Sequence, residues 1–442
     1  MSATEVSLDL VRELRAICGE EYVTERTSPA HQPIAEDTVD LDKSALRPSS
    51  SISVAPGCSE EVAAILRLAN DRAFGVTPVG WAADTLGPFG PTGVLLHINR
   101  LTHVEHYDHA DLTVGVGAGM TVAQLNTMVG ADKLMFACDP PLPKRATIGG
   151  VLAAAKQGPL RHGYGAVRDF CIGMRFVTGD GRKAKGGGRV VKNVAGYDLM
   201  KLLIGSYGTL AVITSASFKL FPAPRQTRTF LAEFATWQGA LKFRDLVLRS
   251  PLSPMCLELV SPGLRKLMRP EVTHDAWVIC VRGSGSDAVL ARYRRELGSA
   301  VTRELDGDDE AKMWRAIEDF PRSLPIRSFT ADRWCYAIIN VPISEVGAAI
   351  RVLEEFATPD GMGLITIGRV GVGVLLVAYR ASAADMMAKV VEAIARQISR
   401  DCSIRQHGPG KVFPLTPTHL PSMRAVKRAL DPNNVLPGKE LF

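Results

Sequence analysis

The distribution of glycine between residues 78 and 213 is the feature that most constrains the fold of this 442-residue chain. Glycines and other small residues concentrate there in four segments, and each segment follows or precedes a strand-like run. Backbone N–H groups can approach a bound phosphate only where the side chain is absent or small. The pattern therefore predicts a dinucleotide site that is built from several loops.

The four segments differ from the motif of a nicotinamide-binding domain. They cover residues 78–85, 116–119, 146–169 and 191–214. None of them is a GxGxxG motif at the first strand–helix turn, which disfavours a Rossmann domain for NAD. One such segment alone is most often a set of tight turns, so it is their order and spacing that favour a cofactor site.

Local patterns predict the elements around these segments. Apolar spacing predicts a helix over Val6–Cys18, and Ser51–Pro56 is typical of a short strand. Ser59 and Thr121 stand where N-caps of two further helices are expected. After the Pro222–Pro224 stretch, strand-like runs alternate with helices in an α+β pattern, and we find no internal repeat.

Composition excludes several classes of protein. The length predicts at least two domains, and 46% hydrophobic with 22% charged residues is typical of a globular chain. A net charge of +6 without a dense basic run disfavours nucleic-acid binding. The N-terminus has no secretory signal pattern and no apolar run is long enough to span a bilayer, so we expect a cytoplasmic protein, or one held at the inner membrane by partners. The eight cysteines form no CxxC pair, which predicts small buried residues rather than metal ligands.

A resemblance to a known family becomes definite when these motifs are taken in order. ATIGG, RHGYGAVRD, VTGDG, VVKNVAGYDLMKLLIGSYGTL and FKLFPAP resemble the FAD-binding domain of the vanillyl-alcohol oxidase/p-cresol methylhydroxylase superfamily. The VVKNVAGYDLMKL stretch is similar to the small FAD-binding subunits of bacterial glycolate oxidases. The resemblance is strong over residues 46–225, moderate at both ends of the chain and weak over residues 226–412.

The resemblance implies a fold and a set of cofactor contacts. The fold is α+β: an N-terminal helix and connector (1–45), a two-subdomain PCMH-type FAD-binding domain (46–225), an α+β cap domain (226–412) and a C-terminal segment returning to the FAD domain (413–442). In the family, the first loop binds the FAD pyrophosphate, and the later segments lie along the dinucleotide and the flavin. The implied contacts are Gly80, Trp81, Ala82, Ala83, Asp84, Thr85, Thr147, Ile148, Gly149, Gly150, Gly158, Arg161, Tyr164, Gly165, Gly208 and Ile213.

The pyrophosphate loop departs from the family pattern. Relatives usually have a GGGT-like loop, whereas here Gly80 is followed by Trp81. The bulky indole implies a rearranged loop or more weakly bound FAD. The loop lacks the His or Cys through which some relatives attach flavin, so we expect non-covalent FAD, and we interpret His162 as a polar lining residue.

The substrate motif of the cap is also altered. Relatives that oxidise D-2-hydroxy acids carry a motif resembling GHVGDGNLH and a later EHGIG, which help to bind a divalent metal and the substrate hydroxyl. The equivalent stretch here begins at Gly368, with Arg369 in place of the first His, and only His407 remains of the second motif. Apolar residues cannot ligate a metal, so we expect no metal site and name His407 and Arg369 as the candidate catalytic residues. The alternative is that this Gly/Val-rich stretch is an ordinary buried strand.

Other candidates have ordinary structural explanations beside the functional ones. His103, His106 and His109 are spaced by three, but a strand–turn–strand would point neighbours of that spacing to opposite faces. Arg161, Arg168 and Lys192 would suit an anion or a solvated surface equally. The stretch from Asp431 to Gly438 resembles the closing segment of the family, with Leu436 where an Asn is usual.

Three functions are compatible with the sequence. The first is an FAD-binding subunit of a glycolate (2-hydroxy acid) oxidase or dehydrogenase complex, working with a larger flavin subunit and an iron–sulfur subunit. The second is a free-standing FAD-dependent oxidoreductase of an alcohol or hydroxy acid. The third is a flavin-free structural subunit of the same complex. Turnover by the isolated chain distinguishes the second from the first, and a flavin spectrum distinguishes the third from both.

Overall fold

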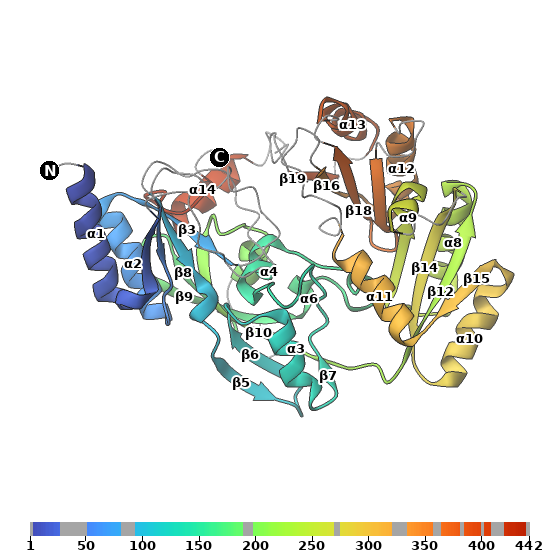
Figure 1. Cartoon of the computed structure of the whole chain (residues 1–442), viewed down its shortest axis with the longest axis horizontal. Helices are drawn as coiled ribbons and strands as arrows, with labels where there is room; N and C mark the ends of the chain where they lie inside the picture. The colour runs from blue at the N-terminus through green and yellow to red at the C-terminus, as the bar shows by residue number, and fades with distance from the viewer. Residues whose placement is uncertain are drawn as a thin grey trace. The chain divides into compact units, whose positions relative to one another are not determined.

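The chain forms two compact units (Figure 1). The computed structural model describes residues 3–26, 51–80, 93–188, 198–268, 275–320, 334–356, 364–380, 384–398, 402–407 and 420–438. Unit 1 comprises Met1–Lys156, Ala166–Pro222 and Leu415–Phe442, and unit 2 comprises Gln157–Gly165 and Ala223–Pro414. The chain thus changes unit directly after Pro222, and the C-terminal segment returns to unit 1.

Unit 1 is built from helices packed on two sheets. Its helices are α1 (Ala3–Cys18), α2 (Ser59–Arg72), α3 (Val122–Gly130), α4 (Ile148–Ala154), α6 (Val167–Phe170), α7 (Leu199–Leu203) and α14 (Leu420–Leu430), with the 3-10 turns η1 (Glu20–Tyr22) and η2 (Ile98–Arg100). Its strands are β1 (Val23–Arg26), β2 (Ser51–Val54), β3 (Gly75–Val79), β4 (Gly93–His97), β5 (Val104–Asp108), β6 (Thr113–Gly117), β7 (Leu134–Met135), β8 (Cys171–Thr178), β9 (Lys183–Gly187), β10 (Ala211–Lys219) and β11 (Phe221–Pro222).

The two main sheets of unit 1 have different pairing. The first has the order β1-β2-β4-β3, in which β4 pairs parallel with both β2 and β3. The second has the order β5-β6-β10-β8-β9 and is antiparallel throughout. The short strands β7 and β11 pair separately. A single core of buried side chains runs from α1 to Val435 and Leu436, which joins both sheets and the C-terminal segment in one unit.

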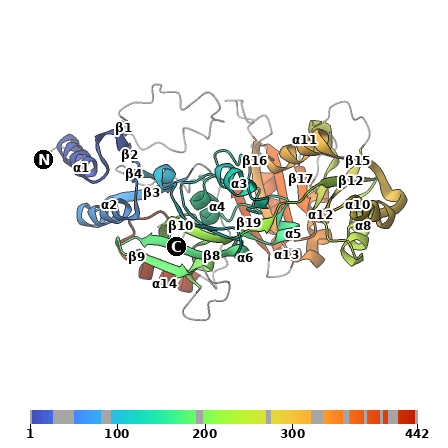
Figure 2. The same cartoon turned by 90° about the horizontal axis from the view of Figure 1, so that it is seen from below.

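Capping explains where several helices of unit 1 begin. The predicted helix cap at Thr121 is confirmed: its hydroxyl accepts the Gln124 N–H, and the Gln124 side chain accepts the Thr121 N–H. The expectation for Ser59 was wrong by one residue. Cys58 is the N-cap of α2, and the Ser59 hydroxyl donates to Glu60 instead. The helices α1 and α2 then lie side by side, as Figures 1 and 2 show.

Unit 2 contains one large antiparallel sheet. Its helices are α5 (Arg161–Tyr164), α8 (Trp237–Arg249), α9 (Pro262–Met268), α10 (Asp287–Leu297), α11 (Gly307–Glu318), α12 (Val346–Glu355) and α13 (Ala384–Gln397), with the 3-10 turns η3 (Gly298–Ala300) and η4 (Ile343–Glu345). Its strands are β12 (Thr227–Phe234), β13 (Cys256–Val260), β14 (Trp277–Ser284), β15 (Val301–Leu305), β16 (Trp334–Asn340), β17 (Leu364–Arg369), β18 (Val374–Arg380) and β19 (Ser403–His407). The strand order is β15-β12-β14-β13-β17-β18-β16-β19.

This order reveals an architectural repeat that the sequence analysis did not find. The elements β12-α8-β13-β14-α10-β15 form one βαββαβ half, and β16-α12-β17-β18-α13-β19 form a second half with the same order of strands. This is the split βαβ, ferredoxin-like arrangement. The halves join edge to edge where β13 pairs with β17, through Leu259 with Gly368 and Val260 with Ile367. The repeat is therefore one of topology, and no clean repeat of residues accompanies it in the sequence.

The two faces of this sheet are covered differently. One face packs against α8, α10, α12 and α13 in a continuous apolar core. The other face carries a smaller cluster with residues of α9 and α11, and Leu160 and Tyr164 pack against it. Because side chains alternate along a strand, this second face also receives the polar residues Glu258, Arg282 and Arg369. Polar groups inside unit 2 are therefore concentrated on one side of the sheet.

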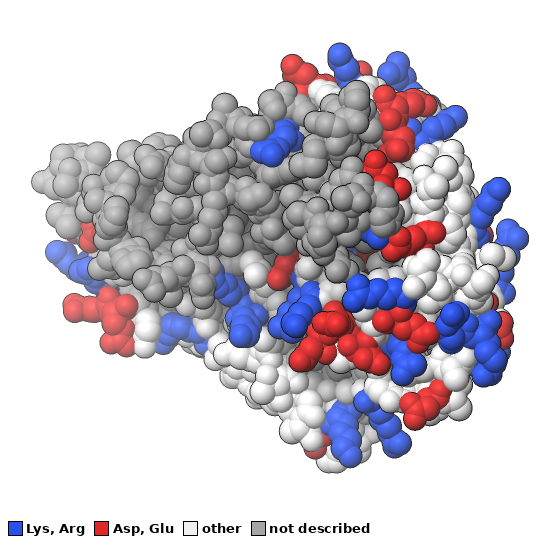
Figure 3. Space-filling view, turned by 45° about the vertical axis from the view of Figure 1, so that its right-hand side comes forward, with Lys and Arg blue, Asp and Glu red and all other residues white. Residues whose placement is uncertain are grey.

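The surface shown in Figure 3 does not favour a polyanionic partner. Lys and Arg side chains alternate there with Asp and Glu side chains over the described part of that face. Among the described residues, no helix is long and apolar enough to cross a membrane.

Candidate functional site

Three of the glycine-rich segments meet around α4 in unit 1. A Cβ atom on Gly80, which follows β3, would lie 2.6 Å from Thr147 Oγ1 and 3.2 Å from Gly150 Cα. A Cβ on Gly208 would lie 3.5 Å from Pro78 Cγ. Pro78, Gly80 and Gly150 are all partly exposed. We call the three partly exposed residues (Pro78, Gly80 and Gly150) the small-residue surface; Gly208, beside Pro78, is buried.

The turn after α7 completes this surface. Gly205 and Gly208 have φ of 85° and 72°, which only glycine adopts without strain. The Gly205 N–H donates to the Leu152 carbonyl at 3.0 Å, and the Tyr207 N–H donates to the Ala153 carbonyl at 2.8 Å. These bonds fix the turn against the last residues of α4. The predicted positions Gly80, Thr147–Gly150 and Gly208 are therefore brought together within unit 1.

The second segment lies beneath α4 and serves close backbone packing. A Cβ on Gly117 would lie 2.1 Å from the Leu101 carbonyl oxygen, and one on Gly119 would lie 2.0 Å from the Ile98 carbonyl oxygen. Any larger residue would force the two chain segments apart. These glycines are explained by the fold itself, since η2 and the residues after it cross directly over them.

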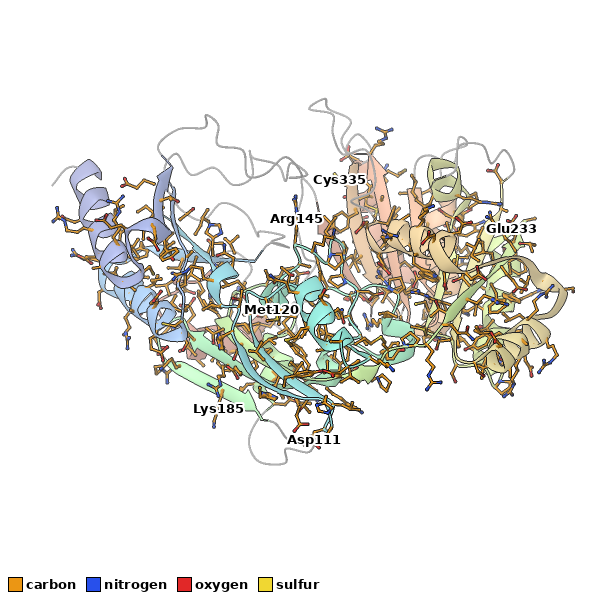
Figure 4. All side chains as sticks on the ribbon, turned by 60° about the horizontal axis from the view of Figure 1, so that its bottom comes forward. Asp111, Met120, Arg145, Lys185, Glu233 and Cys335 are labelled. Atoms are coloured by element: carbon orange, nitrogen blue, oxygen red, sulfur yellow. The ribbon has the colours of Figure 1, made fainter. Side chains whose placement is uncertain are left out.

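The backbone N–H groups in the first turn of α4 are already hydrogen-bonded to other parts of unit 1. The Ile148 N–H donates to the carbonyl of Met120, which is labelled in Figure 4, and the Gly149 N–H donates to the Ala118 carbonyl. The Gly150 N–H donates to Thr147 Oγ1 at 3.2 Å. The usual phosphate donors of a helix N-terminus are thus already engaged. We conclude that α4 contributes close approach rather than free N–H groups.

Ile213 lies in β10, where the ladder is irregular. It pairs with Phe176 of β8, and the register shifts before Ser215. The carbonyl of the intervening Thr214 accepts the Ala118 N–H at 2.9 Å instead. The side chain of Ile213 is buried, so only its main chain could face a ligand. Bulges of this kind redirect a strand and are common beside functional sites.

Gly158, Arg161, Tyr164 and Gly165 belong to unit 2 rather than to unit 1. The Gly163 N–H donates to the Met255 carbonyl at 3.0 Å, which fixes α5 against the start of β13. Burial raises the pKa of Tyr164; the neighbouring Cys256 raises it further, whereas Arg282 lowers it. The phenol is therefore neutral at physiological pH and serves as a hydrogen-bonding group.

His162 lies over the turn between β17 and β18. A Cβ on Gly371 would lie 2.3 Å from His162 Nδ1, so this glycine is required by the imidazole above it. Nδ1 is buried and has no hydrogen-bond partner in the part of the chain that the structure describes, and burial lowers the pKa of His162. The imidazole is therefore uncharged near pH 7. His162 thus lies on α5, above the hairpin that carries Arg369, and its role as a polar lining residue stays a prediction.

Arg369 forms a buried ion pair that sequence reasoning missed. Its Nε lies 3.9 Å from Oε1 of Glu258, and the two side chains are 7% and 0% exposed. The register of β13 and β17 puts these residues directly opposite each other, one step beyond Leu259 and Gly368. Burial and the nearby Glu258 raise the pKa of Cys280, so its thiol stays protonated. The signal in the sequence is a single acid at the centre of the apolar run CLELV.

The two candidate catalytic residues do not come together. Arg369 of β17 stands level with Ser403 of β19, three strands away across the sheet. The pairs between them are Arg369 with Val374, Val374 with Asn340, and Asn340 with Ser403. His407 is four residues further along β19 and pairs with Tyr336. At the usual strand spacing and rise, the two Cα atoms are on the order of 20 Å apart. One catalytic centre cannot contain both residues.

The stretch containing Arg369 folds as an ordinary hairpin. Gly368 and Arg369 end β17, and β18 begins at Val374 with buried side chains on both faces. Among the described residues there is no group of three or more His, Cys, Asp or Glu arranged for a metal ion. His103 lies directly before the edge strand β5, and His106 lies within it. His103 Nε2 is 3.6 Å from Glu105 Oε1.

A buried lysine closes unit 1 beside the Gly208 turn. Lys427 Nζ lies 2.5 Å from Asp431 Oδ2 and 2.7 Å from the Thr209 carbonyl, with the Leu436 and Pro437 carbonyls at 3.1 and 3.0 Å. Asp431 also accepts the N–H groups of Val435 and Leu436. Burial lowers the pKa of Lys427, whereas its hydrogen bond to Asp431 and the carboxylate charge oppose this shift. The closing segment is thus tied to the residue that follows Gly208.

Two family models match the chain, one after the other. Residues 50–185 match the FAD binding domain family, and residues 223–439 match the family of FAD linked oxidases, C-terminal domain. The chain is 31% identical to a D-lactate dehydrogenase of Archaeoglobus fulgidus over 418 residues, which is 88% of this chain and 90% of that protein. The chain belongs to the FAD-linked oxidases.

Further relatives agree with the family. Glycolate oxidase subunit GlcE of Escherichia coli is 32% identical over 311 residues, covering 68% of this chain and 78% of that protein. Among solved structures, an alkyldihydroxyacetonephosphate synthase superposes with a TM-score of 0.66 at 16% identity, covering 87% of this chain and 75% of that one. This last similarity confirms the fold, a PCMH-type FAD-binding domain followed by the C-terminal domain of FAD-linked oxidases.

The residues of this FAD-linked oxidase fit its cofactor. FAD supplies a two-electron acceptor, which makes the chain an FAD-dependent oxidoreductase. Gly80 and Gly150 are partly exposed and carry no side chain, so a dinucleotide could approach their backbone closely. Trp81, Ala82, Ala83, Asp84, Thr85 and Lys192 lie outside the described residues, so their contacts and the non-covalent attachment stay predictions.

Proposed function

We propose that this FAD-linked oxidase is a flavin subunit of a complex that oxidises a short 2-hydroxy acid such as glycolate. The observation that carries the proposal is similarity over most of the chain: it aligns over 88% of its length with a protein named D-lactate dehydrogenase, and over 68% with glycolate oxidase subunit GlcE. A second glycolate oxidase subunit, GlcD of Bacillus subtilis, is 26% identical over 416 residues. All three names describe oxidation of a carbon that bears a hydroxyl beside a carboxylate.

The chemistry requires a hydride acceptor, a base and a group that holds the carboxylate. Oxidation of a 2-hydroxy acid transfers a hydride from the hydroxyl-bearing carbon to FAD and a proton from the hydroxyl to a base, which leaves a 2-keto acid. The buried guanidinium of Arg369 is suited to a carboxylate, because its planar fork offers directed N–H groups. Electrons would then leave the reduced protein through a larger flavin subunit and an iron–sulfur subunit. Membrane attachment, in this proposal, is through those partners.

A second function is supported by one specific observation. The Archaeoglobus relative, of which the chain covers 90% of the length, is named as a dehydrogenase and not as a subunit. Under this alternative the chain turns over a 2-hydroxy acid alone and passes electrons directly to an acceptor.

Turnover with and without partners separates the two functions. The purified chain is assayed anaerobically with glycolate or D-lactate and an artificial electron acceptor, alone and after co-expression with a larger flavin subunit and an iron–sulfur subunit. The subunit proposal predicts little turnover alone and at least tenfold more in the complex. Equal turnover per flavin in both preparations would replace it by the free-standing enzyme. No association and no turnover in either preparation would contradict both.

A further inference from the structure

Arg282 of β14 is an arginine that three neighbours hold in a fixed orientation. Its Nε donates to Glu310 Oε1 at 3.1 Å, and its Nη2 lies 3.5 Å from Thr227 Oγ1. Its Cζ lies 5.5 Å from the centroid of the Trp314 ring, which is within cation–π range. A guanidinium that is already oriented loses little conformational freedom when it binds a ligand.

The groups that hold Arg282 form a closed and buried network. The side chains of Glu310 and Trp314 are almost completely buried. The Glu310 carboxylate accepts the hydroxyls of Thr227 and Thr229 at 2.6 and 2.8 Å. Trp314 Nε1 donates to Thr229 Oγ1 at 2.8 Å. The inner edge of the guanidinium is therefore fixed by groups that are themselves satisfied.

The outer edge of the guanidinium consists of Nη1 and the remaining side of Nη2, and we call it the open edge of Arg282. The side chain is 20% exposed. Within the described part of the chain, Nη1 donates no hydrogen bond and is not a buried atom. Arg244 of α8, over the other face of the sheet, is different. Its Nε and Nη2 contact Asp245, and its Nη1 lies 3.4 and 3.5 Å from two main-chain carbonyls. All three nitrogens of Arg244 thus have protein partners, whereas Arg282 keeps N–H groups for a ligand.

The surroundings of the open edge favour an anion. Glu310 is the one acid that the described residues place within ion-pair distance of Arg282, and its charge is shared with two threonine hydroxyls. The Gly163 N–H donates to the Met255 carbonyl, and the Met255 N–H donates to the Arg282 carbonyl. These bonds bring Tyr164 of α5 close to Arg282. Burial raises the pKa of Tyr164, so its phenol adds no negative charge there near pH 7.

The shape of the open edge indicates the kind of anion. A guanidinium edge with two nitrogen atoms matches a carboxylate, with which it forms paired charge-assisted hydrogen bonds. We propose that Arg282 binds the carboxylate of the short 2-hydroxy acid and of its 2-keto acid product. This inference rests on the proposed function, and it assigns the carboxylate to Arg282 rather than to Arg369. The side chain of Arg369 is 7% exposed and lies beside Glu258, so a ligand reaches Arg282 more readily.

The inference predicts a preference for a carboxylate over a neutral analogue of similar shape. Pyruvate and its amide, pyruvamide, differ in that group, and neither gives a hydride to FAD, so their binding is measured without turnover. The wild-type chain should bind pyruvate more tightly than pyruvamide. Arg282→Gln should weaken pyruvate by roughly tenfold or more, for a lost charged hydrogen bond, and change pyruvamide by less than about twofold.

The test is a calorimetric measurement of both dissociation constants on the FAD-loaded full chain. Arg228→Gln is the matched control. Arg228 stands on the neighbouring strand β12, on the opposite face of the sheet, where it pairs with Glu304 and Asp306. The control removes the same charge from the same sheet, so it should leave the ratio of the two dissociation constants unchanged.

Two double variants keep the test valid if a single variant fails to fold. Arg282→Gln leaves the Glu310 carboxylate buried without its cation, so Arg282→Gln/Glu310→Gln removes both charges together. This double variant should fold and lose the preference for pyruvate. Arg369→Gln/Glu258→Gln removes the other buried pair on the same face, and it should retain that preference.

The outcomes separate this inference from the proposed function. A preference for pyruvate that is lost in the Arg282 variants, and kept in the Arg228 and Arg369 variants, supports the inference. Equal or undetectable binding of the two compounds by the wild-type chain, unchanged constants in the folded Arg282 variants, or loss only in the Arg369 variant would overturn it. Flavin reduction by D-lactate or glycolate in any of those cases would leave the proposed function standing. The predicted binding without flavin reduction, even with the partner subunits present, would leave the carboxylate site and overturn the proposed function, and failure of both would overturn both.

Discussion

Replacing Lys427 by Met tests whether the C-terminal segment stabilises the cofactor-binding half of the protein. Lys427 and Asp431 are both almost completely buried, with side chains 3% and 0% exposed. The substitution leaves the Asp431 charge without its cation and three carbonyls without their shared donor. Removing one partner of a buried ion pair costs about 3–5 kcal/mol. We therefore expect unit 1 to lose a large part of its stability.

The assay is thermal unfolding followed by circular dichroism, with FAD present and absent. For a domain of roughly 150–250 residues, each kcal/mol lowers the midpoint by about 2–4 °C, so the expected shift is roughly 6–20 °C. Lys201→Met is the matched control. Lys201 pairs with Asp198 at 2.8 Å, but both side chains are exposed, so its loss should cost at most about 1 kcal/mol.

A double variant checks the reasoning about charge. Lys427→Met/Asp431→Asn removes the unpaired carboxylate, while the amide oxygen still accepts one of the N–H groups that Asp431 receives. It should recover at least about 1 kcal/mol relative to Lys427→Met, because the unpaired charge contributes the larger part of the penalty. A midpoint for Lys427→Met that equals that of Lys201→Met would refute the argument that this pair stabilises unit 1.

Three further predictions concern packing, pH and thiols. Gly80→Ala should destabilise unit 1 by about 1–3 kcal/mol and weaken FAD binding, since the added Cβ has no room. Gly130→Ala is the control, because its added Cβ meets nothing within 4 Å, and it should be neutral or slightly stabilising. Equal thermal midpoints of the two variants would contradict this. Burial lowers the pKa of His162, so the unfolded chain takes up this proton before the folded protein does, and the free energy of unfolding decreases as pH falls below 6.5. His162→Gln should reduce the dependence of the free energy of unfolding on pH. An unchanged dependence in urea titrations would refute the argument. With Ellman's reagent, only Cys58 and Cys402 of the eight free cysteines should react in the native protein, and a third rapid thiol would contradict the burial of the others.

Local elements were predictable from the sequence because they depend on neighbours in the chain. The Thr121 cap, the helix ending at Cys18 and the change of unit at Pro222 all follow from spacing, capping and turn residues within a few positions. The burial of most cysteines followed from their scatter and composition. The motif order likewise indicated the FAD-binding domain, since glycines must stand where backbones approach closely.

Non-local features escaped prediction. The two βαββαβ halves of unit 2 share strand order rather than residues, so no repeat is visible in the sequence. The pairing of Glu258 with Arg369 depends on the register of two strands that are more than a hundred positions apart. The engaged amides of α4 depend on carbonyls of Ala118 and Met120, which only the folded backbone brings near. Such relations require the register of the sheets, which local pattern does not fix.

The most direct test of the account is the visible spectrum of the purified full-length chain, recorded anaerobically before and after addition of D-lactate or glycolate. The account predicts about one flavin per chain, released by acid or heat denaturation as expected for non-covalent FAD. It further predicts bleaching of the flavin band by a hydroxy acid once the partner subunits are present. A chain that binds no flavin even after incubation with FAD would contradict the central claim that this FAD-linked oxidase uses the cofactor of its family.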